Sequence, residues 1–268
     1  NEKTAVEEAL GMSYCGLRAI TSMKHVGVNV AADPFVNSAM TGANGGLLVI
    51  AADDPSMHSS QNEQDSRFYA DFAMMPCLEP SNQQEAYDMA RYGFELSERN
   101  GIPVMVRLTT RLSHSRSVVE TDDEPMAQNK LHYPENPRQW VLMPAISKIR
   151  NRQLIKDFDA FVKESEESPF NRYEEGHDHH LGIIASGIAY NYLMECFGGN
   201  CPFPVVKVSQ YPLPEKYMRR VYDSCDALLI LEEGQPFIEK SLRGLASEGK
   251  KIYGKLTGQV VRDGELSP

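Results

Sequence analysis

Leu47-Leu48-Val49-Ile50-Ala51-Ala52 is a run of six apolar residues without the polar alternation of a half-exposed strand. Such a run is typical of a parallel strand that helices cover on both faces. The turn sequence Asp53-Asp54-Pro55-Ser56 follows it directly. We therefore predict a central strand of an α/β sheet at residues 47–52, with polar residues at its carboxyl end.

Helical and strand patterns alternate on both sides of this run. Strand patterns occupy residues 19–23, 76–79 and 104–108, and helical patterns occupy residues 3–18, 33–44 and 82–100. Ser81 precedes the last helix and Gly101 follows it, as at many helix ends. The β-α-β-α-β order predicts a parallel sheet with right-handed crossovers within residues 1–115.

A second α/β unit follows a segment of different composition. Residues 116–140 are polar and proline-rich, which indicates an exposed connection, and residues 147–165 have the spacing of an amphipathic helix. Strand patterns at 181–185, 204–208, 227–231 and 251–255 then alternate with helical patterns at 188–197, 214–225 and 236–247. We predict two parallel-sheet α/β domains, 1–115 and 177–268, and a connecting segment with one helix, 116–176.

Composition narrows the classes of function. The chain has 268 residues and a formal net charge of −10, which argues against nucleic-acid binding and against a polybasic membrane-surface protein. We find neither an apolar run of about 18 residues that would span a membrane nor a signal peptide. The five cysteines include no C-x2-C pair, so we expect free thiols in a cytoplasmic protein and no metal on these residues.

Polar side chains gather directly after the predicted strands of the first domain. In chain order these include Lys24, His25, His58, Gln61, Asn62 and Arg111. Ligands of open parallel sheets bind at the carboxyl ends of the strands, so this pattern predicts a polar binding cleft at one sheet edge. The chain has no P-loop, G-x-G-x-x-G, G-x-S-x-G or H-E-x-x-H motif, and local pattern therefore names no reaction.

Three uninterrupted segments carry a specific resemblance. They read MKHVGVNVAADP (23–34), ADDPSMHSSQNEQDSR (52–67) and RLTTRLSHSR (107–116), and a weaker likeness continues through residues 181–188 and 231–234. These segments resemble the alpha subunit of indolepyruvate ferredoxin oxidoreductases. The resemblance implies a pyrimidine-type thiamine diphosphate domain followed by a domain similar to the carboxyl-terminal domain of transketolase.

The family resemblance also implies an activity and partners. Its members oxidatively decarboxylate aryl 2-oxo acids such as indolepyruvate, transfer the acyl group to coenzyme A and reduce ferredoxin, in a hetero-oligomer with a smaller beta subunit. Mg²⁺ and [4Fe-4S] clusters would be bound by segments for which these 268 residues have no motif. Because the chain starts at Asn1 and not at Met, we interpret it as an internal fragment that is inactive alone.

Site residues are carried over from the family one position at a time. Glu2 stands nine residues before Gly11, the spacing at which relatives have the glutamate that contacts the pyrimidine ring and activates thiamine diphosphate. Arg111-Leu112-Ser113-His114 resembles an Arg-x-Ser-His step of relatives acting on pyruvate, and a guanidinium suits a 2-oxo acid carboxylate. His25 either assists substrate binding and proton transfer or is a structural histidine.

The remaining candidates are expected to contact the cofactor. They are Lys24, Gly27, His58, Gln61 and Asn62, of which the last three either line the cleft or meet a partner domain. Two alternatives to this function stay open. The chain could belong to another 2-oxo acid:ferredoxin oxidoreductase, of the pyruvate or 2-oxoglutarate type, or it could be a non-catalytic α/β scaffold subunit.

Overall fold

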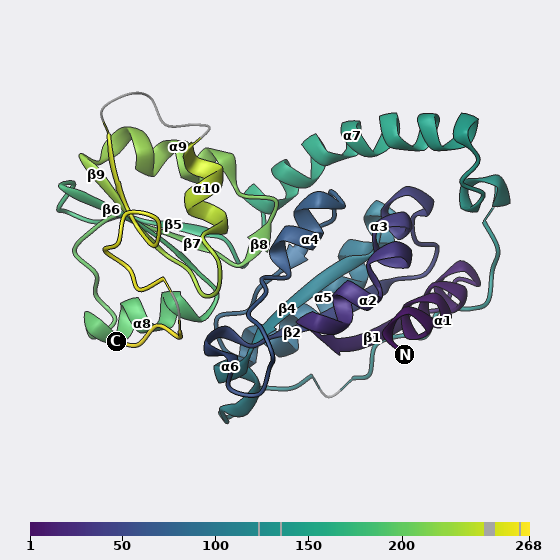
Figure 1. Cartoon of the computed structure of the whole chain (residues 1–268), viewed down its shortest axis with the longest axis horizontal. Coiled ribbons are helices and arrows are strands. Elements are labelled where there is room, and N and C mark those ends of the chain that lie inside the picture. Colours follow the sequence, from purple (N-terminus) through teal and green to yellow (C-terminus); the bar gives the residue numbers. More distant parts are fainter. Residues whose placement is uncertain (123, 135, 244–249, 263) are drawn as a thin grey trace.

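The computed structural model describes residues 1–122, 124–134, 136–243, 250–262 and 264–268. Two α/β units lie beside each other, and a long helix, α7 (Pro144–Glu166), runs along one side of the molecule and links them (Figure 1). The predicted α/β class with two sheets is confirmed. The amphipathic helix predicted at 147–165 is α7, which buries Leu154 and Phe161.

The first sheet has the strand order β1-β2-β4-β3-β8. Its parallel strands are β1 (Ala19–Lys24), β2 (Leu47–Asp53), β3 (Cys77–Leu78) and β4 (Val104–Thr109). The apolar run 47–52 forms β2 and pairs with β1 on one side and β4 on the other. The predicted central strand is therefore confirmed.

Helices cover both faces of this sheet because successive residues of a strand point to opposite sides. Leu48 packs in the cluster that includes Met89 and Leu96 of α5 (Gln83–Asn100), whereas Leu47 and Val49 belong to the core on the other face. The helices other than α5 in this unit are α1 (Glu2–Tyr14), α2 (His25–Val30), α3 (Ala32–Thr41), α4 (Arg67–Phe72) and α6 (Thr110–His114), with a 3-10 turn at Pro55–Met57.

The ends of α5 show how local sequence sets its length. The Asn82 side chain accepts a hydrogen bond from the Glu85 amide at 2.9 Å and so caps the first turn. Gly101 ends the helix with φ 60°, a left-handed conformation that glycine adopts without a steric penalty. The predicted end of the helix is confirmed, and the residue that caps its start is Asn82 and not Ser81.

The second sheet has the strand order β10-β9-β6-β7-β5. Its strands are β5 (Arg172–Glu174), β6 (Leu181–Ser186), β7 (Val205–Val208), β9 (Ala227–Leu231) and β10 (Lys251–Tyr253). Its helices are α8 (Ile188–Cys196), α9 (Glu215–Ser224) and α10 (Phe237–Arg243). Residues 244–247 of the helix predicted at 236–247 lie outside the described residues.

Each sheet also has an antiparallel edge strand that local pattern did not predict. β5 pairs with β7 in the second sheet. β8 (Gln210–Tyr211) comes from the second half of the chain and yet pairs with β3 of the first sheet. The Asn171 side chain fixes this crossing, since its amide donates to the carbonyl of Gln210 and its oxygen accepts from the amides of Ser209 and Gln210.

The connection at 116–140 has no regular structure over its described residues apart from a 3-10 turn at Pro137–Trp140, and positions 123 and 135 lie outside the description. Most of its described residues are exposed, as the composition indicates. Within the described ranges, every helix is too short or too polar to cross a bilayer.

Candidate active site

The carboxyl ends of β1, β2 and β4 meet at one edge of the first sheet. Lys24 lies in register with Ala52, and Asp53 lies in register with Thr109. The segments that follow these strands, α2, the loop at 54–66 and α6, therefore start side by side. A cleft of about 480 Å³ opens at this edge, so the predicted polar cleft is present.

Glu2 and Gly27 lie in direct contact, although 25 positions separate them. A Cβ atom on Gly27 would stand 2.7 Å from Cγ and 3.2 Å from Oε1 of Glu2. Only a glycine therefore lets the Glu2 side chain pack on the first turn of α2. The Asn1 side chain caps α1 by accepting from the Thr4 amide at 3.2 Å, which fixes the helix start that carries Glu2.

The Glu2 carboxylate is only partly exposed. Among the described residues it has neither a hydrogen-bond partner nor an ion-pair partner. Gly11, in contrast, has no atom within 4 Å of the position of an added Cβ. Gly11, whose spacing from Glu2 matches that of relatives, therefore makes no contact that requires a glycine, whereas Gly27 is required for the position of the Glu2 side chain.

His25 and Lys24 hold the loop that follows β2. His25 is completely buried, with Nε2 3.0 Å from the carbonyl oxygen of Asn62 and Nδ1 3.4 Å from that of Ala52. The Lys24 ammonium donates to the carbonyl oxygen of Ser59 at 2.6 Å. Both side chains therefore have a structural role, because these hydrogen bonds hold the loop against the ends of β1 and β2.

Asp54 organises the first half of this loop. Its carboxylate accepts from the amides of His58 and Ser59 and from the hydroxyls of Ser60 and Thr110, at distances of 2.6 to 3.2 Å. Desolvation favours the protonated acid, but these hydrogen bonds outweigh it and hold the pKa of Asp54 below its ordinary value. The loop therefore presents a fixed conformation to the cleft.

Arg111 gives the cleft a cationic rim. Its lining residues are His58, Thr110, Arg111, His114, Ser115 and Glu265. Arg111 donates to Glu265 Oε2 at 2.6 Å, and His58 Nε2 lies 3.4 Å from Glu265 Oε1. Arg111 and His58 thus lie together, as predicted, whereas Glu265 gave no signal in the sequence because its partners are far away in the chain.

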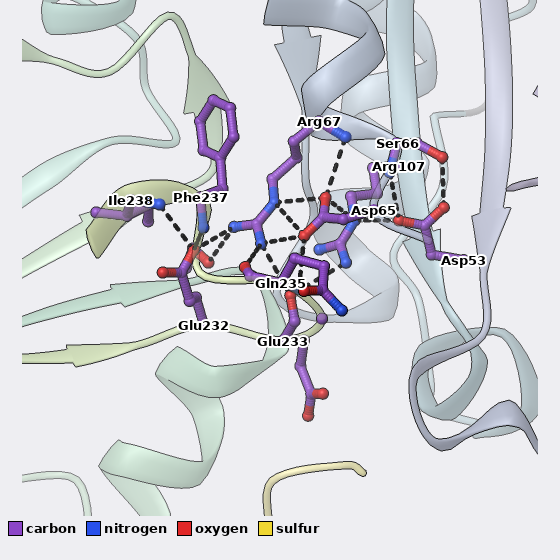
Figure 2. Close-up of polar contacts among 12 residues, drawn as sticks. Asp53, Asp65, Ser66, Arg67, Arg107, Glu232, Glu233, Gln235, Phe237 and Ile238 are labelled. Atoms are coloured by element: carbon purple, nitrogen blue, oxygen red, sulfur yellow. Dashed lines mark hydrogen bonds and ion pairs between the residues drawn. The ribbon is translucent and has the colours of Figure 1, made fainter. Parts of the chain in front are cut away.

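A buried cluster of charged side chains joins the two units behind this edge (Figure 2). Arg107 of β4 donates to Asp53 at 2.6 Å, to Glu79, and to the backbone oxygen of Glu233 at 3.1 Å. It has no exposed surface. We refer to Asp53, Asp65, Arg67, Glu79, Arg107, Glu232 and Glu233 as the interdomain charge cluster.

Arg67 makes the second set of bonds in the interdomain charge cluster. Its guanidinium contacts Asp65 and lies 3.0 Å from Glu232 Oε2, and it donates to the backbone oxygens of Glu233 and Gln235 at 2.9 and 3.0 Å. Because Asp65 and Arg67 belong to the first unit and the other three to the second, these bonds fix the two units against each other.

The carboxyl groups of the cluster differ in their pKa values. Desolvation opposes ionisation of Asp65, but the two arginines outweigh it and lower its pKa to about 2. Burial raises the pKa of Asp53 and of Glu232, against the attraction of one arginine each. Burial also raises the pKa of Glu233 to about 7. The cluster therefore mixes permanent ion pairs with acids that hold a proton more readily.

No sequence pattern predicted this cluster. One signal was available, because Arg107 lies inside the apolar strand 104–108, where a buried guanidinium requires buried carboxylates. Of the predicted site residues, Glu2 and Gly27 form one group and His58 and Arg111 form another. Within the described residues, no hydrogen bond or ion pair connects Glu2 with Arg111. Gln61 is exposed and Asn62 contributes its backbone oxygen to His25.

Comparison with known proteins gives consistent matches. Residues 1–178 match the family described as pyruvate flavodoxin/ferredoxin oxidoreductase, thiamine diphosphate-binding. The chain is 41% identical to the indolepyruvate oxidoreductase subunit IorA of Archaeoglobus fulgidus, over 97% of this chain and 42% of that protein. It is also 41% identical to the subunit of the same name from Pyrococcus abyssi, over 95% and 41% respectively.

The chain thus spans about two fifths of the length of the curated relatives it matches. Its fold is similar to that of a 2-oxoglutarate:ferredoxin oxidoreductase from Magnetococcus marinus, with a TM-score of 0.71 at 15% sequence identity. That match covers 95% of this chain and 53% of the other. At this identity the similarity concerns the fold alone.

Proposed function

The chain belongs to the pyruvate flavodoxin/ferredoxin oxidoreductase family of thiamine diphosphate-binding domains, and from this premise we propose that it carries the pyrimidine-binding half of an indolepyruvate oxidoreductase active site. The relatives named indolepyruvate oxidoreductase support the choice of aryl 2-oxo acids as substrates. The observation that carries the proposal is the contact of Glu2 with Gly27. It presents a carboxylate, without a partner among the described residues, at the edge where ligands of parallel sheets bind.

Thiamine diphosphate fits this arrangement by the chemistry of its donor and acceptor groups. Bound thiamine diphosphate supplies the electron sink for decarboxylation of a 2-oxo acid. Glu2 would hold a proton between its carboxylate oxygen and a ring nitrogen of the pyrimidine. Gly27 would keep Glu2 in place, while Lys24, His25 and Asn62 would act indirectly by fixing the loop after β2.

The cationic rim supports a role in substrate binding. In the proposal, Arg111 and His58 bind the carboxylate of the 2-oxo acid, since a guanidinium forms strong charge-assisted hydrogen bonds with a carboxylate. Gln61 is exposed and would contact the cofactor or a partner domain. The proposed enzyme also uses coenzyme A as a substrate and has ferredoxin and a smaller beta subunit as protein partners. It would bind Mg²⁺ and [4Fe-4S] clusters through parts outside these 268 residues.

The decisive experiment replaces Glu2 with Gln in the complete enzyme. We expect loss of deuterium exchange at C2 of thiamine diphosphate, measured by NMR after quenching, with the cofactor still bound. Gly27→Ala should reduce exchange as well, because the new Cβ would stand within 3 Å of Glu2. Gly11→Ala is the matched control, since its Cβ meets no atom within 4 Å, and it should leave exchange unchanged.

Two further measurements separate the alternatives. If Glu2→Gln leaves C2 exchange unchanged, Glu2 is not the activating acid and a scaffold role gains support. A comparison of kcat/KM for indolepyruvate, pyruvate and 2-oxoglutarate then tests the substrate class, with indolepyruvate expected to be preferred. Calorimetry on the 268-residue chain alone should detect no micromolar binding of thiamine diphosphate, because half of the proposed site lies on another domain.

A further inference from the structure

Residues 264–266, which we call the strap, lie across the cationic rim of the cleft. Glu265 reaches Arg111 at 2.6 Å with one carboxylate oxygen and His58 at 3.4 Å with the other. The next residue anchors the strap to the second unit, because the Leu266 amide donates to Glu233 Oε1 at 3.0 Å. The strap therefore touches both units at the point where the cleft opens.

The position of Glu265 resembles that of a bound ligand. Its side chain is only 12% exposed, whereas those of Arg111 and His58 are 52% and 51% exposed. The carboxylate thus points inward, and the Arg111 and His58 side chains contact it from the rim. Among the described residues, Glu265 is the single ion-pair partner of Arg111.

Two polar atoms near the strap lack partners. The hydroxyl of Tyr192 and Oε2 of Glu233 are buried and have no hydrogen-bond partner in the described part of the chain. Tyr192 on α8 interacts electrostatically with Arg111, Glu233 and Glu265, so these groups lie in one neighbourhood. Buried polar groups are usually hydrogen-bonded, so the arrangement with the strap in place leaves two polar groups of this neighbourhood unsatisfied.

We propose that the strap is an internal competitor for the substrate: Glu265 occupies the carboxylate position between Arg111 and His58, and a small carboxylate must displace it to enter the cleft. This inference rests on the proposed function, because it takes Arg111 and His58 as the groups that recognise the 2-oxo acid. Arg111 has a carboxylate partner both before and after the exchange. Because the Arg111 side chain is half exposed, the loss of its ion pair with Glu265 during opening costs little.

Hydrogen–deuterium exchange on the intact protein tests the strap directly, without thiamine diphosphate or any reactive substrate. The probe is indole-3-acetate, an aryl carboxylate that cannot be decarboxylated by this chemistry. Saturating probe should accelerate exchange of the Leu266 amide, since the displaced strap loses its bond to Glu233. Tryptophol, which has the indole ring and no carboxylate, should leave this exchange unchanged.

Binding of the same probe gives a second, independent measurement. If the strap fills the cleft nine-tenths of the time, Glu265→Gln should tighten the Kd of indole-3-acetate about tenfold. Arg111→Gln should weaken it, and adding Glu265→Gln to that variant should give no further gain. Glu175→Gln is the matched control, because Glu175 is another acid paired with an arginine, Arg220, away from the cleft.

The proposal is overturned if Glu265→Gln leaves probe affinity unchanged or weakens it, or if saturating probe slows exchange at Leu266 or leaves it unchanged. These outcomes do not depend on turnover or on the cofactor. Failure of the proposed function would instead appear as unchanged C2 exchange in Glu2→Gln, so the two failures are distinguishable.

Discussion

Replacement of Arg107 by Met should be among the most destabilising single changes in this chain. The side chain is fully buried and its removal takes a donor from Asp53, from Glu79 and from the Glu233 backbone. Breaking a buried ion pair from one side costs about 3–5 kcal/mol, because the partner charge stays buried. For a protein of this size that corresponds to a decrease in Tm of roughly 6–20 °C.

Urea and thermal unfolding of the variant at pH 7 measure this loss. Arg219→Met is the control, since Arg219 is exposed and pairs with Glu215 one helical turn away, and it should cost less than about 0.5 kcal/mol. The deficit of Arg107→Met should shrink as the pH falls. Arg107 also lies 3.5 Å from Asp65, whose pKa is lowered to about 2 in the folded wild type. The stability from the Arg107–Asp65 ion pair is therefore present above about pH 4 and disappears toward pH 2.

A loss below about 1 kcal/mol, or a loss equal to that of the control, would refute the view that the interdomain charge cluster holds the units together. Arg107→Lys adds a graded test. It keeps the charge but loses the planar fork that reaches Asp53 and Glu79 together, and we expect an intermediate loss of stability. A lysine variant as stable as the wild type would mean that charge alone is sufficient.

Three more predictions concern stability, each measured by urea unfolding. Because burial raises the pKa of Glu233 to about 7, the wild type should lose a few kcal/mol between pH 4.5 and 7 as this acid ionises, and Glu233→Gln should not show that decline. Asn171→Ala should cost about 2–4 kcal/mol, since four backbone groups lose buried partners; a loss near zero would contradict the clamp on β8. Gly45→Ala should be strongly destabilising, because its Cβ would lie 2.2 Å from the carbonyl oxygen of Leu17.

The strands and the sheet edge were predictable because the information is local. A run such as residues 47–52 shows a buried parallel strand in consecutive positions, and polar residues directly after it must lie at the carboxyl edge. β8 carried no such signal. It has two residues, and the bond between Tyr211 and Glu79 connects positions 132 apart in the chain, so its pairing depends on how the two units meet.

In the candidate site, too, some residues were predictable from local sequence and others were not. Lys24, His25, His58 and Arg111 follow strands, and the edge position expected from that order is confirmed. The assignment of Glu2 came from family resemblance, because an acid at the start of a helix is ordinarily explained by the helix dipole. Glu265 was not predictable in either way, because its two partners lie more than 150 positions away in the chain.

Glu233 of the interdomain charge cluster also binds the strap, and this contact connects stability with access to the cleft. The backbone oxygen of Glu233 accepts from both Arg67 and Arg107, at 2.9 and 3.1 Å. The side chain of the same residue accepts from the Leu266 amide. The anchor of the strap is therefore fixed to the first unit by two buried guanidinium groups, while Glu265 meets the first unit again at Arg111. If the two units moved apart as rigid bodies, the bonds of Glu233 to Arg67 and Arg107 would break together with the bond of Glu265 to Arg111. The strap therefore opens without cost to the cluster when its own backbone dihedral angles change and the two units stay in place.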